Sequence, residues 1–208
     1  MEIPLFPLGS VLFPGGRMPL QIFEQRYLDL VRGCMKEGTG FGVAWIAAGA
    51  EVAHPGAGQP NLGEVGCYAR IVDWDSLPNG LLGITIEGGE RFRLKSARAE
   101  SNMLVMGEVD LESAREAVPM REEWDSMLEV LRSLEQHPHV KRMGLNVDHG
   151  DAWQVGTLLA QLLPVDERIK YHLLRLDDID DFMAQMDHIL NELGGTEPEP
   201  EEVPENPN

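Results

Sequence analysis

The sequence predicts an α+β fold in which a β-rich half, residues 1–112, precedes a helical half, residues 113–193. Short apolar segments separated by proline and glycine fill the first half, which is typical of a small closed or twisted β-barrel. Apolar residues at helical spacing fill the second half. The last segment, residues 194–208, carries five acidic residues and no basic one, and it is predicted to be disordered because it cannot bury apolar surface.

The opening of the chain, residues 1–21, predicts two or three short strands broken by prolines. Proline has no N–H to donate to a β-ladder, so it marks strand edges and corners. Four prolines have this role: Pro4, Pro7, Pro14 and Pro19. Gly15-Gly16 permits a reversal of the backbone that residues with a β-carbon resist.

The first helix is predicted from Ile22 to Lys36, with apolar residues on one face and charged residues on the other. Its first turn holds a carboxylate, a guanidinium and a phenol that we expect to fix the helix to the barrel rather than to transfer protons: Glu24, Arg26 and Tyr27. Phe41 to Ala48 is an apolar run with strand character. Residues 49–63 are rich in glycine, proline and alanine and predict a loop.

A meander of short strands is predicted next, over residues 67–74, 81–86, 91–95 and 104–110. Pro78-Asn79-Gly80 predicts a hairpin turn, because Asn-Gly adopts the positive φ angles that tight turns require. Gly88-Gly89 predicts a second turn. The alternation of polar and apolar residues from Arg91 to Lys95 is typical of a half-buried strand.

Four helices are predicted in the second half, at about 124–131, 155–162, 166–174 and 178–193. Pro164 ends the second of them, and Asp178 is a good N-cap for the last. Gly194-Gly195 stops that last helix.

The chain resembles the substrate-binding N-terminal domain of Lon proteases over about residues 2–193. The opening residues carry this resemblance together with three later segments, which occur in the expected order and spacing. These segments are Glu64–Ile71, which ends in Ala-Arg-Ile; Leu77–Leu94, which contains Gly-x-x-Arg-Phe; and Leu162–Leu174, which resembles the family's Leu-Pro-x-x-x-x-Lys segment but has five residues between Pro164 and Lys170. One departure is Cys67, which occupies a position where the family usually has threonine.

The resemblance implies a barrel of the pseudouridine-synthase-and-archaeosine-transglycosylase (PUA) type with one short helix, followed by a helical bundle. It also implies a non-catalytic module that recognises protein segments. A Lon protease needs a phosphate-binding Gly-x-x-x-x-Gly-Lys-Ser/Thr loop and a serine–lysine peptidase module, and this sequence contains neither. We therefore expect a free-standing domain with no cofactor, rather than an enzyme.

The expected partners are unfolded or extended protein segments, together with a protease or chaperone. Exposed apolar residues on the barrel, or in the crease between barrel and bundle, would bind such segments by apolar burial and strand pairing. The candidate binding residues lie where prolines leave backbone groups unpaired: Phe13, Pro14, Met18, Pro19 and Phe23.

Two alternative functions come from other classes. A PUA-like barrel suggests nucleic-acid binding by analogy of fold alone. The loop Asp148-His149-Gly150-Asp151, with His137 and His139 nearby, suggests a small metal-dependent hydrolase. We expect structural roles for these residues, because the loop lacks a His pair at i, i+4 and Asp151 is placed to cap a helix.

The net charge of −18 argues against nucleic acid and anionic membranes as partners, because binding phosphates requires a basic face. No apolar run approaches the ~18 residues of a membrane helix, and no targeting signal opens the chain, so we expect a cytoplasmic protein. The two cysteines, Cys34 and Cys67, are predicted to be buried reduced thiols. The alternative for Cys67 is a redox-sensitive thiol.

Overall fold

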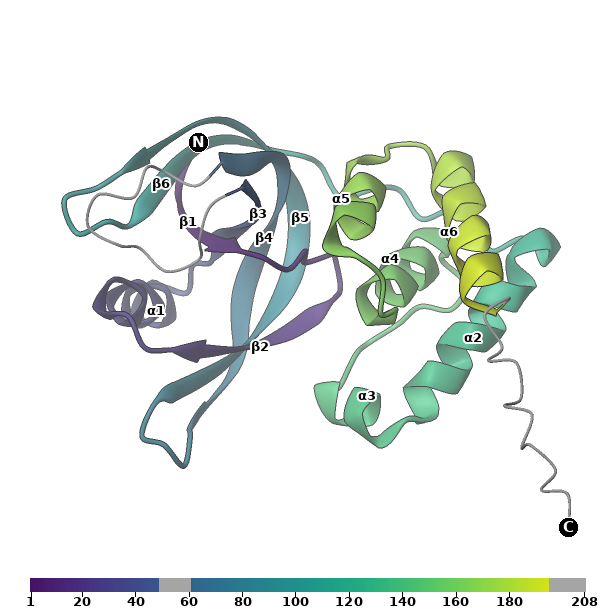
Figure 1. Cartoon of the computed structure of the whole chain (residues 1–208), viewed down its shortest axis with the longest axis horizontal. Coiled ribbons are helices and arrows are strands. Elements are labelled where there is room, and N and C mark those ends of the chain that lie inside the picture. The colour runs from purple at the N-terminus through teal and green to yellow at the C-terminus, as the bar shows by residue number, and fades with distance from the viewer. Residues whose placement is uncertain (49–60, 195–208) are drawn as a thin grey trace, which may run out of the picture.

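The computed structural model describes residues 1–48 and 61–194, which form a mixed six-stranded sheet and six α-helices (Figure 1). The strands are β1 (Glu2–Leu8), β2 (Arg17–Ile22), β3 (Phe41–Ala48), β4 (Asn61–Ser76), β5 (Leu82–Ala99) and β6 (Val105–Leu111). The helices are α1 (Gln25–Glu37), α2 (Asp125–Gln136), α3 (Pro138–Met143), α4 (Ala152–Leu162), α5 (Glu167–Arg175) and α6 (Ile179–Gly194), with a 3-10 turn at Glu122–Trp124.

The strand order is β2-β5-β4-β3-β1-β6, and β5 also pairs with β6. Only β1 and β3 are parallel. Five strands therefore form a closed circuit of pairings, β1–β3–β4–β5–β6–β1. Strand β2 lies outside this circuit and pairs with the first third of β5, from Leu82 to Glu87.

Two apolar clusters fill the sheet half. The larger one lies between α1 and the sheet, where Tyr27 stacks on Phe6 at 3.9 Å between ring centroids. Arg26 covers the Tyr27 ring and donates to the Met103 carbonyl at 2.5 Å, which confirms that the first turn of α1 fixes the helix to the sheet. The smaller cluster surrounds Phe92.

The helical half has its own core, which brings α2, α4, α5 and α6 together around fully buried side chains such as Phe182 and Leu158. Three residues of the sheet half join this core: Val11, Phe13 and Val65. The two halves seen in Figure 1 therefore share apolar contacts across their junction.

A buried guanidinium also ties the halves together. Arg91 of β5 is 7% exposed and donates to the carbonyl oxygens of Leu174 (2.6 Å) and Leu176 (3.2 Å), just after α5. The same side chain forms ion pairs with Glu112 at 2.5 Å and with Asp177.

Several elements differ from the sequence-based expectations. Gly88-Gly89 is not a turn, because β5 runs straight through it from Leu82 to Ala99. Helix α3 was not predicted. Strand β1 is not an edge strand, although each of its prolines lies where only one neighbour is paired: Pro4 opposite β6 and Pro7 opposite β3.

Other expectations are confirmed. Strand β3 has the predicted bounds, and the two predicted caps, Asp151 and Asp178, accept backbone N–H bonds at the start of α4 and α6. Most of the predicted 49–63 loop and nearly all of the 194–208 tail lie outside the described residues. Within the described residues, no helix has the length and apolar character needed to cross a membrane.

Candidate functional site

Strand β2 begins with a tight turn followed by a β-bulge. Gly16 N–H donates to the Phe13 carbonyl at 3.0 Å, which closes a turn around Pro14-Gly15, and Gly15 has φ +75°. Gly15 N–H then donates to the Gly88 carbonyl (2.8 Å), and Gly88 N–H to the Gly16 carbonyl (2.9 Å). Gly15 and Gly16 of one strand thus lie opposite the single residue Gly88 of the other, and Gly15 has the left-handed conformation. This is the geometry of a G1 bulge. The predicted reversal at Gly15-Gly16 is confirmed.

This bulge sets which backbone groups of β2 face outward. Bonded and non-bonded pairs alternate along an antiparallel ladder, and Gly16 opposite Gly88 is a bonded pair. Arg17, Pro19 and Gln21 are therefore at non-bonded positions, with their backbone groups directed away from β5. Pro19 accordingly costs no ladder bond.

Strand β2 is an edge strand of the sheet along its whole length. Among the strands that the structure describes, each of the others has at least two partners, whereas β2 has only β5. An unpaired edge is a template for another strand, and proteins usually protect it. The outward N–H groups of Arg17 and Gln21 and the carbonyl groups of Arg17, Pro19 and Gln21 make up this template.

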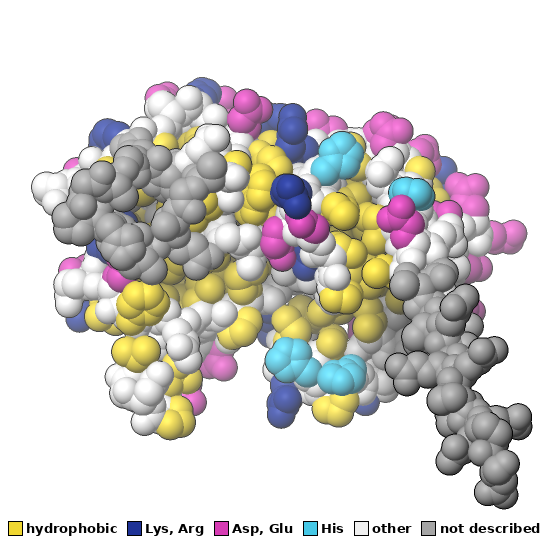
Figure 2. Space-filling model, in the orientation of Figure 1, with side chains coloured by type: hydrophobic (Ala, Val, Ile, Leu, Met, Phe, Trp, Pro, Cys, Tyr) yellow, Lys and Arg dark blue, Asp and Glu magenta, His cyan; other side chains and the backbone are white. Residues whose placement is uncertain are grey.

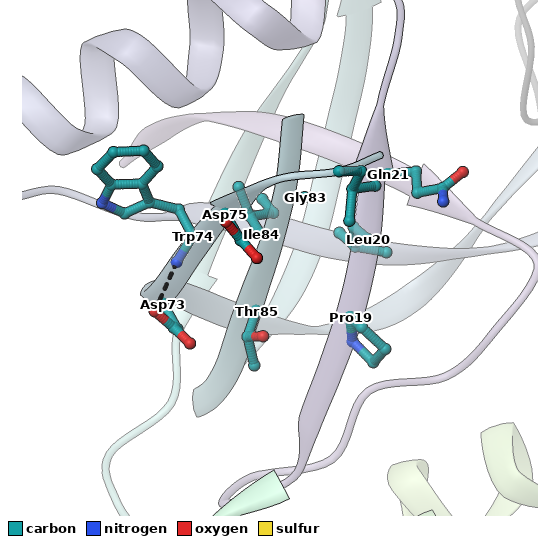
Figure 3. Close-up of a pocket in the computed structure, with 10 residues that line it drawn as sticks. Pro19, Leu20, Gln21, Asp73, Trp74, Asp75, Gly83, Ile84 and Thr85 are labelled. Atoms are coloured by element: carbon teal, nitrogen blue, oxygen red, sulfur yellow. Dashed lines mark hydrogen bonds between the residues drawn. The ribbon is translucent and has the colours of Figure 1, made fainter. Parts of the chain in front are cut away.

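A hollow of about 350 Å³ lies across β2, β5 and β4 towards the tip of the β4–β5 hairpin (Figure 3). The strand register produces rows of side chains across it, including Pro19–Thr85–Asp73 and Gln21–Gly83–Asp75. Gly83 has no side chain, so the second row is open above it. A β-carbon at this position would come within 3.0 Å of the Leu77 side chain.

A second hollow of about 470 Å³ lies between these strands and α3. It shares Pro19, Asp73 and Thr85 with the first hollow, so the two are continuous, and we call them together the β2 groove. Its wall on the helical side consists of His139, Arg142, Met143 and Gly144. Figure 2 shows the surface hollowed between the hairpin, at the lower left, and the region of α3.

One side chain bridges the β2 groove. Arg17 pairs with Glu87 at 2.7 Å between Nε and Oε2, and it donates to the Met143 carbonyl at 2.9 Å. This bridge holds α3 beside the sheet edge. The Arg17–Glu87 ion pair is only partly buried and adds little stability. The hydrogen bond from Arg17 to the Met143 carbonyl is therefore the contact that positions α3.

Two large apolar side chains near the end of β2 and in the hairpin are exposed. Phe23, just beyond the end of β2, is 57% exposed. Trp74 of β4 is 59% exposed, but it alternates with Asp73 and Asp75 along the strand, so its ring lies on the opposite face and is turned away from them in Figure 3. Exposed aromatic groups of this size are characteristic of interaction surfaces.

The candidate residues from the sequence are distributed over three environments. Phe13 is fully buried in the helical core, so its side chain cannot contact a ligand, and that part of the candidate set is corrected. Met18 and Pro19 line the β2 groove, and Phe23 is exposed just after β2 ends. Pro14 instead lines a separate cavity at the junction of the halves.

Sequence reasoning missed the residues that the hairpin and α3 contribute to the β2 groove, such as Asp73, Trp74 and Arg142. A tryptophan among polar residues just before the predicted Asn79-Gly80 turn was the available signal. Nothing in the sequence indicated that α3 lies beside β2.

The junction cavity has a volume of about 330 Å³ and contains the stacked pair Arg115 and Trp153, with 3.6 Å from the guanidinium carbon to the ring centroid. Burial, together with the nearby charge of Arg91, lowers the pKa of Arg115 to about 10. Arg115 also donates to the Leu176 carbonyl. These polar groups are already used within the fold, so we assign the cavity a structural role.

The residues considered for a metal-dependent hydrolase, in the loop Asp148–Asp151, also have structural partners. Asp151 accepts bonds from the N–H groups of Trp153 (3.1 Å) and Val118 (3.2 Å), and His149 pairs with Glu135 at 3.0 Å. Within the described part of the chain, no three His, Cys, Asp or Glu side chains are placed to hold a metal ion.

Both cysteines are buried. Cys67 has no exposed surface and Cys34 is 5% exposed, and burial raises the pKa of each thiol. The thiolate is the reactive form, so a raised pKa disfavours reaction.

Comparison with known proteins shows which family the chain matches and which solved structures share its fold. A family model described as the ATP-dependent protease La (LON) substrate-binding domain matches residues 2–192. A Lon protease from Porphyromonas gingivalis is 30% identical over 148 residues, covering 71% of this chain and 17% of that protein. Lon protease 2 from Myxococcus xanthus is 32% identical over 93 residues, covering 44% of this chain and 11% of that protein. The chain thus spans less than a fifth of these relatives.

Two solved structures resemble this fold. A Lon N-terminal domain protein from Xanthomonas campestris has a TM-score of 0.71 and 34% identity, and the match covers 92% of this chain and 98% of that one. The N-terminal domain of a Lon protease from the Mycobacterium avium complex has a TM-score of 0.61 and 13% identity, with 90% and 97% covered. The second match supports the fold alone.

Proposed function

Because the chain belongs to the substrate-binding domain family of ATP-dependent protease La (Lon), we propose that it is a non-catalytic module that binds unfolded or extended protein segments. The observation that carries this proposal is the single-partner edge of β2, which opens beside a groove and exposed apolar side chains. In the same proposal the module acts in protein quality control, as an adaptor that passes such segments to a protease or chaperone.

Binding would occur by addition of a strand to β2. An extended segment would accept hydrogen bonds from the N–H groups of Arg17 and Gln21 and donate to the outward carbonyls, including that of Pro19. Its alternate side chains would enter the β2 groove beside Pro19 and Thr85. Backbone bonds of this kind do not depend on the side chains of the segment, so one edge serves many sequences.

We also propose a division of the chain near residue 112. The closed circuit of strand pairings, with α1 over one end, would be the PUA-like barrel of residues 1–112, and the remaining helices a bundle of residues 113–193. Separate apolar clusters in the two halves support this division. The contacts of Val11, Phe13 and Val65 with the helical core imply that the halves do not separate readily.

Gln21 offers a specific test of strand addition. In Gln21→Pro the outward N–H is lost, while no bond to β5 is affected because the position is non-bonded. Gln21→Ala changes the same side chain and keeps the N–H, so it is the matched control. Binding would be measured by fluorescence anisotropy of a labelled, permanently unfolded polypeptide.

We expect Gln21→Pro to weaken binding about three- to tenfold, as for the loss of one backbone hydrogen bond and its strand geometry, and Gln21→Ala to bind like the wild type. Urea unfolding would verify that both variants are folded. Equal affinity of a folded Gln21→Pro variant would contradict strand addition at β2. Salt-dependent binding of RNA in place of polypeptide would favour the nucleic-acid alternative.

A further inference from the structure

The β2 groove has walls of opposite charge. Asp73 and Asp75 lie on the hairpin side, and Arg142 lies on the α3 side with His139 beside it. Asp73 and Arg142 line the same 470 Å³ hollow but form no ion pair with each other. The space between the two walls therefore separates charges that have not neutralised each other.

Arg142 differs from most of the basic side chains in its surroundings. Arg17 in the same groove is paired with Glu87, and Arg91, Arg93 and Arg115 share Glu112 and Asp177. Arg142 is exposed and takes part in no ion pair within residues 1–48 and 61–194. Its guanidinium is thus available for a ligand that carries a negative charge.

The carboxylates of the opposite wall are turned towards their own backbone. The Asp73 carboxylate accepts the Trp74 N–H at 2.9 Å, and the Asp75 carboxylate accepts the Ser76 N–H at 2.7 Å. They would repel an acidic side chain on the hairpin side of the groove and direct it to α3. The two walls together therefore orient a charged ligand.

We propose that the β2 groove selects extended protein segments with an acidic residue facing α3, and that Arg142 is the residue that determines this specificity. The inference rests on the proposed function, since it concerns the segment bound along β2. A guanidinium suits a carboxylate because its planar N–H groups match the two oxygens.

The net charge of −18 does not oppose this selectivity at physiological salt. The Debye length there is about 8 Å, so charges beyond the groove are largely screened. The charges that matter are those lining the groove: Asp73, Asp75, Arg142, His139, and the Arg17–Glu87 pair, which is already neutral overall.

The test uses two labelled ten-residue peptides with the same apolar centre, one with glutamate on either side of it and one with glutamine at the same positions. Anisotropy titrations at about 0.15 M salt would compare them on the wild type, Arg142→Glu and Arg132→Glu. Arg132, on α2, is likewise exposed and in no ion pair among the described residues, but it does not line the groove, so it is the matched control.

We expect the wild type to bind the glutamate peptide about two- to fivefold more tightly than the glutamine peptide, the range for one exposed ion pair. Arg142→Glu should lose or reverse this preference, and Arg132→Glu should keep it. Equal affinity of the wild type for both peptides, or an unchanged preference in Arg142→Glu, would overturn the specificity but leave strand addition standing. If neither peptide nor the unfolded polypeptide bound, both proposals would fail.

Discussion

Gly88 of β5 lies directly against the backbone of Phe13, where a β-carbon would come within 2.2 Å of the Phe13 carbonyl oxygen. Real β-carbons do not approach a backbone atom so closely. The contact joins the turn that starts β2 to the strand that β2 pairs with. The placement of the candidate binding edge therefore depends on a glycine.

Gly88→Ala should reduce the free energy of unfolding by about 1–3 kcal/mol, because the backbone of Phe13 or of β5 must move to admit a methyl group. Gly33→Ala is the matched control: it lies inside α1 with nothing within 4 Å of the added carbon. It should raise stability by about 0.5–1 kcal/mol. Urea unfolding measures both, and a neutral Gly88→Ala would show that the contact relaxes easily.

Arg91 and Arg93 share the same two acidic partners, Glu112 and Asp177, but differ in burial. Arg91→Met should cost about 1–3 kcal/mol, because it leaves the buried Leu174 carbonyl without its donor and leaves Glu112 with only the exposed Arg93 as an ion-pair partner. Arg93→Met, at a side chain 52% exposed, should cost less than about 1 kcal/mol. Urea unfolding measures both variants. If the two lost a similar free energy of unfolding, burial would not explain the contribution of Arg91 to stability.

The same cluster predicts a dependence on pH. The hydrogen bond from Arg91 lowers the pKa of Asp177, so this carboxylate binds a proton less readily in the folded than in the unfolded chain. Its contribution to stability is present above the ordinary aspartate pKa of about 3.9 and is lost as the pH falls through the lower, folded value.

Asp177→Asn should therefore lower the urea midpoint relative to the wild type at pH 7, and the difference should shrink as the pH falls below about 4. Because the Asp177 side chain is 60% exposed, solvent screening should keep the effect small. A difference that grew on acidification would have the wrong sign for this explanation.

The two thiols should be inert in the folded protein. Cys67 and Cys34 are buried and have raised pKa values, so we expect a thiol reagent at pH 8 to label neither within the time that labels the denatured chain. In increasing urea, labelling should follow unfolding as measured by tryptophan fluorescence. Fast labelling of Cys67 in native buffer would restore the redox-sensitive alternative.

Local sequence signals predicted the elements that depend on neighbouring residues. Phe41–Ala48 is a strand whose first four residues, Phe41 to Ala44, are buried, and Asp151 and Asp178 begin helices because a carboxylate satisfies the free N–H groups of the first turn. The short α3 was missed, since its six residues contain only one buried side chain, Val140, and so show no apolar period.

Long-range contacts explain the expectations that were wrong. Gly88-Gly89 has the composition of a turn, yet Gly88 is required by the close approach of Phe13, 75 residues earlier in the chain. Phe13 was expected at an exposed edge because prolines surround it, but the helical half covers its side chain. A local sequence pattern cannot show which segments so far apart in the chain come into contact.

The sequence alone determined the α+β class, the order of a β-rich and a helical half, the starts of α5 and α6 and the family resemblance, because propensity, periodicity and capping act over a few residues. Only the tertiary structure decided that β2 is an edge strand, that Met18 and Pro19 line a groove while Phe13 is buried, and that Arg142 and Asp73 line the same hollow. Those relationships arise when strands pair and helices pack, and a binding surface is made of residues that meet only then.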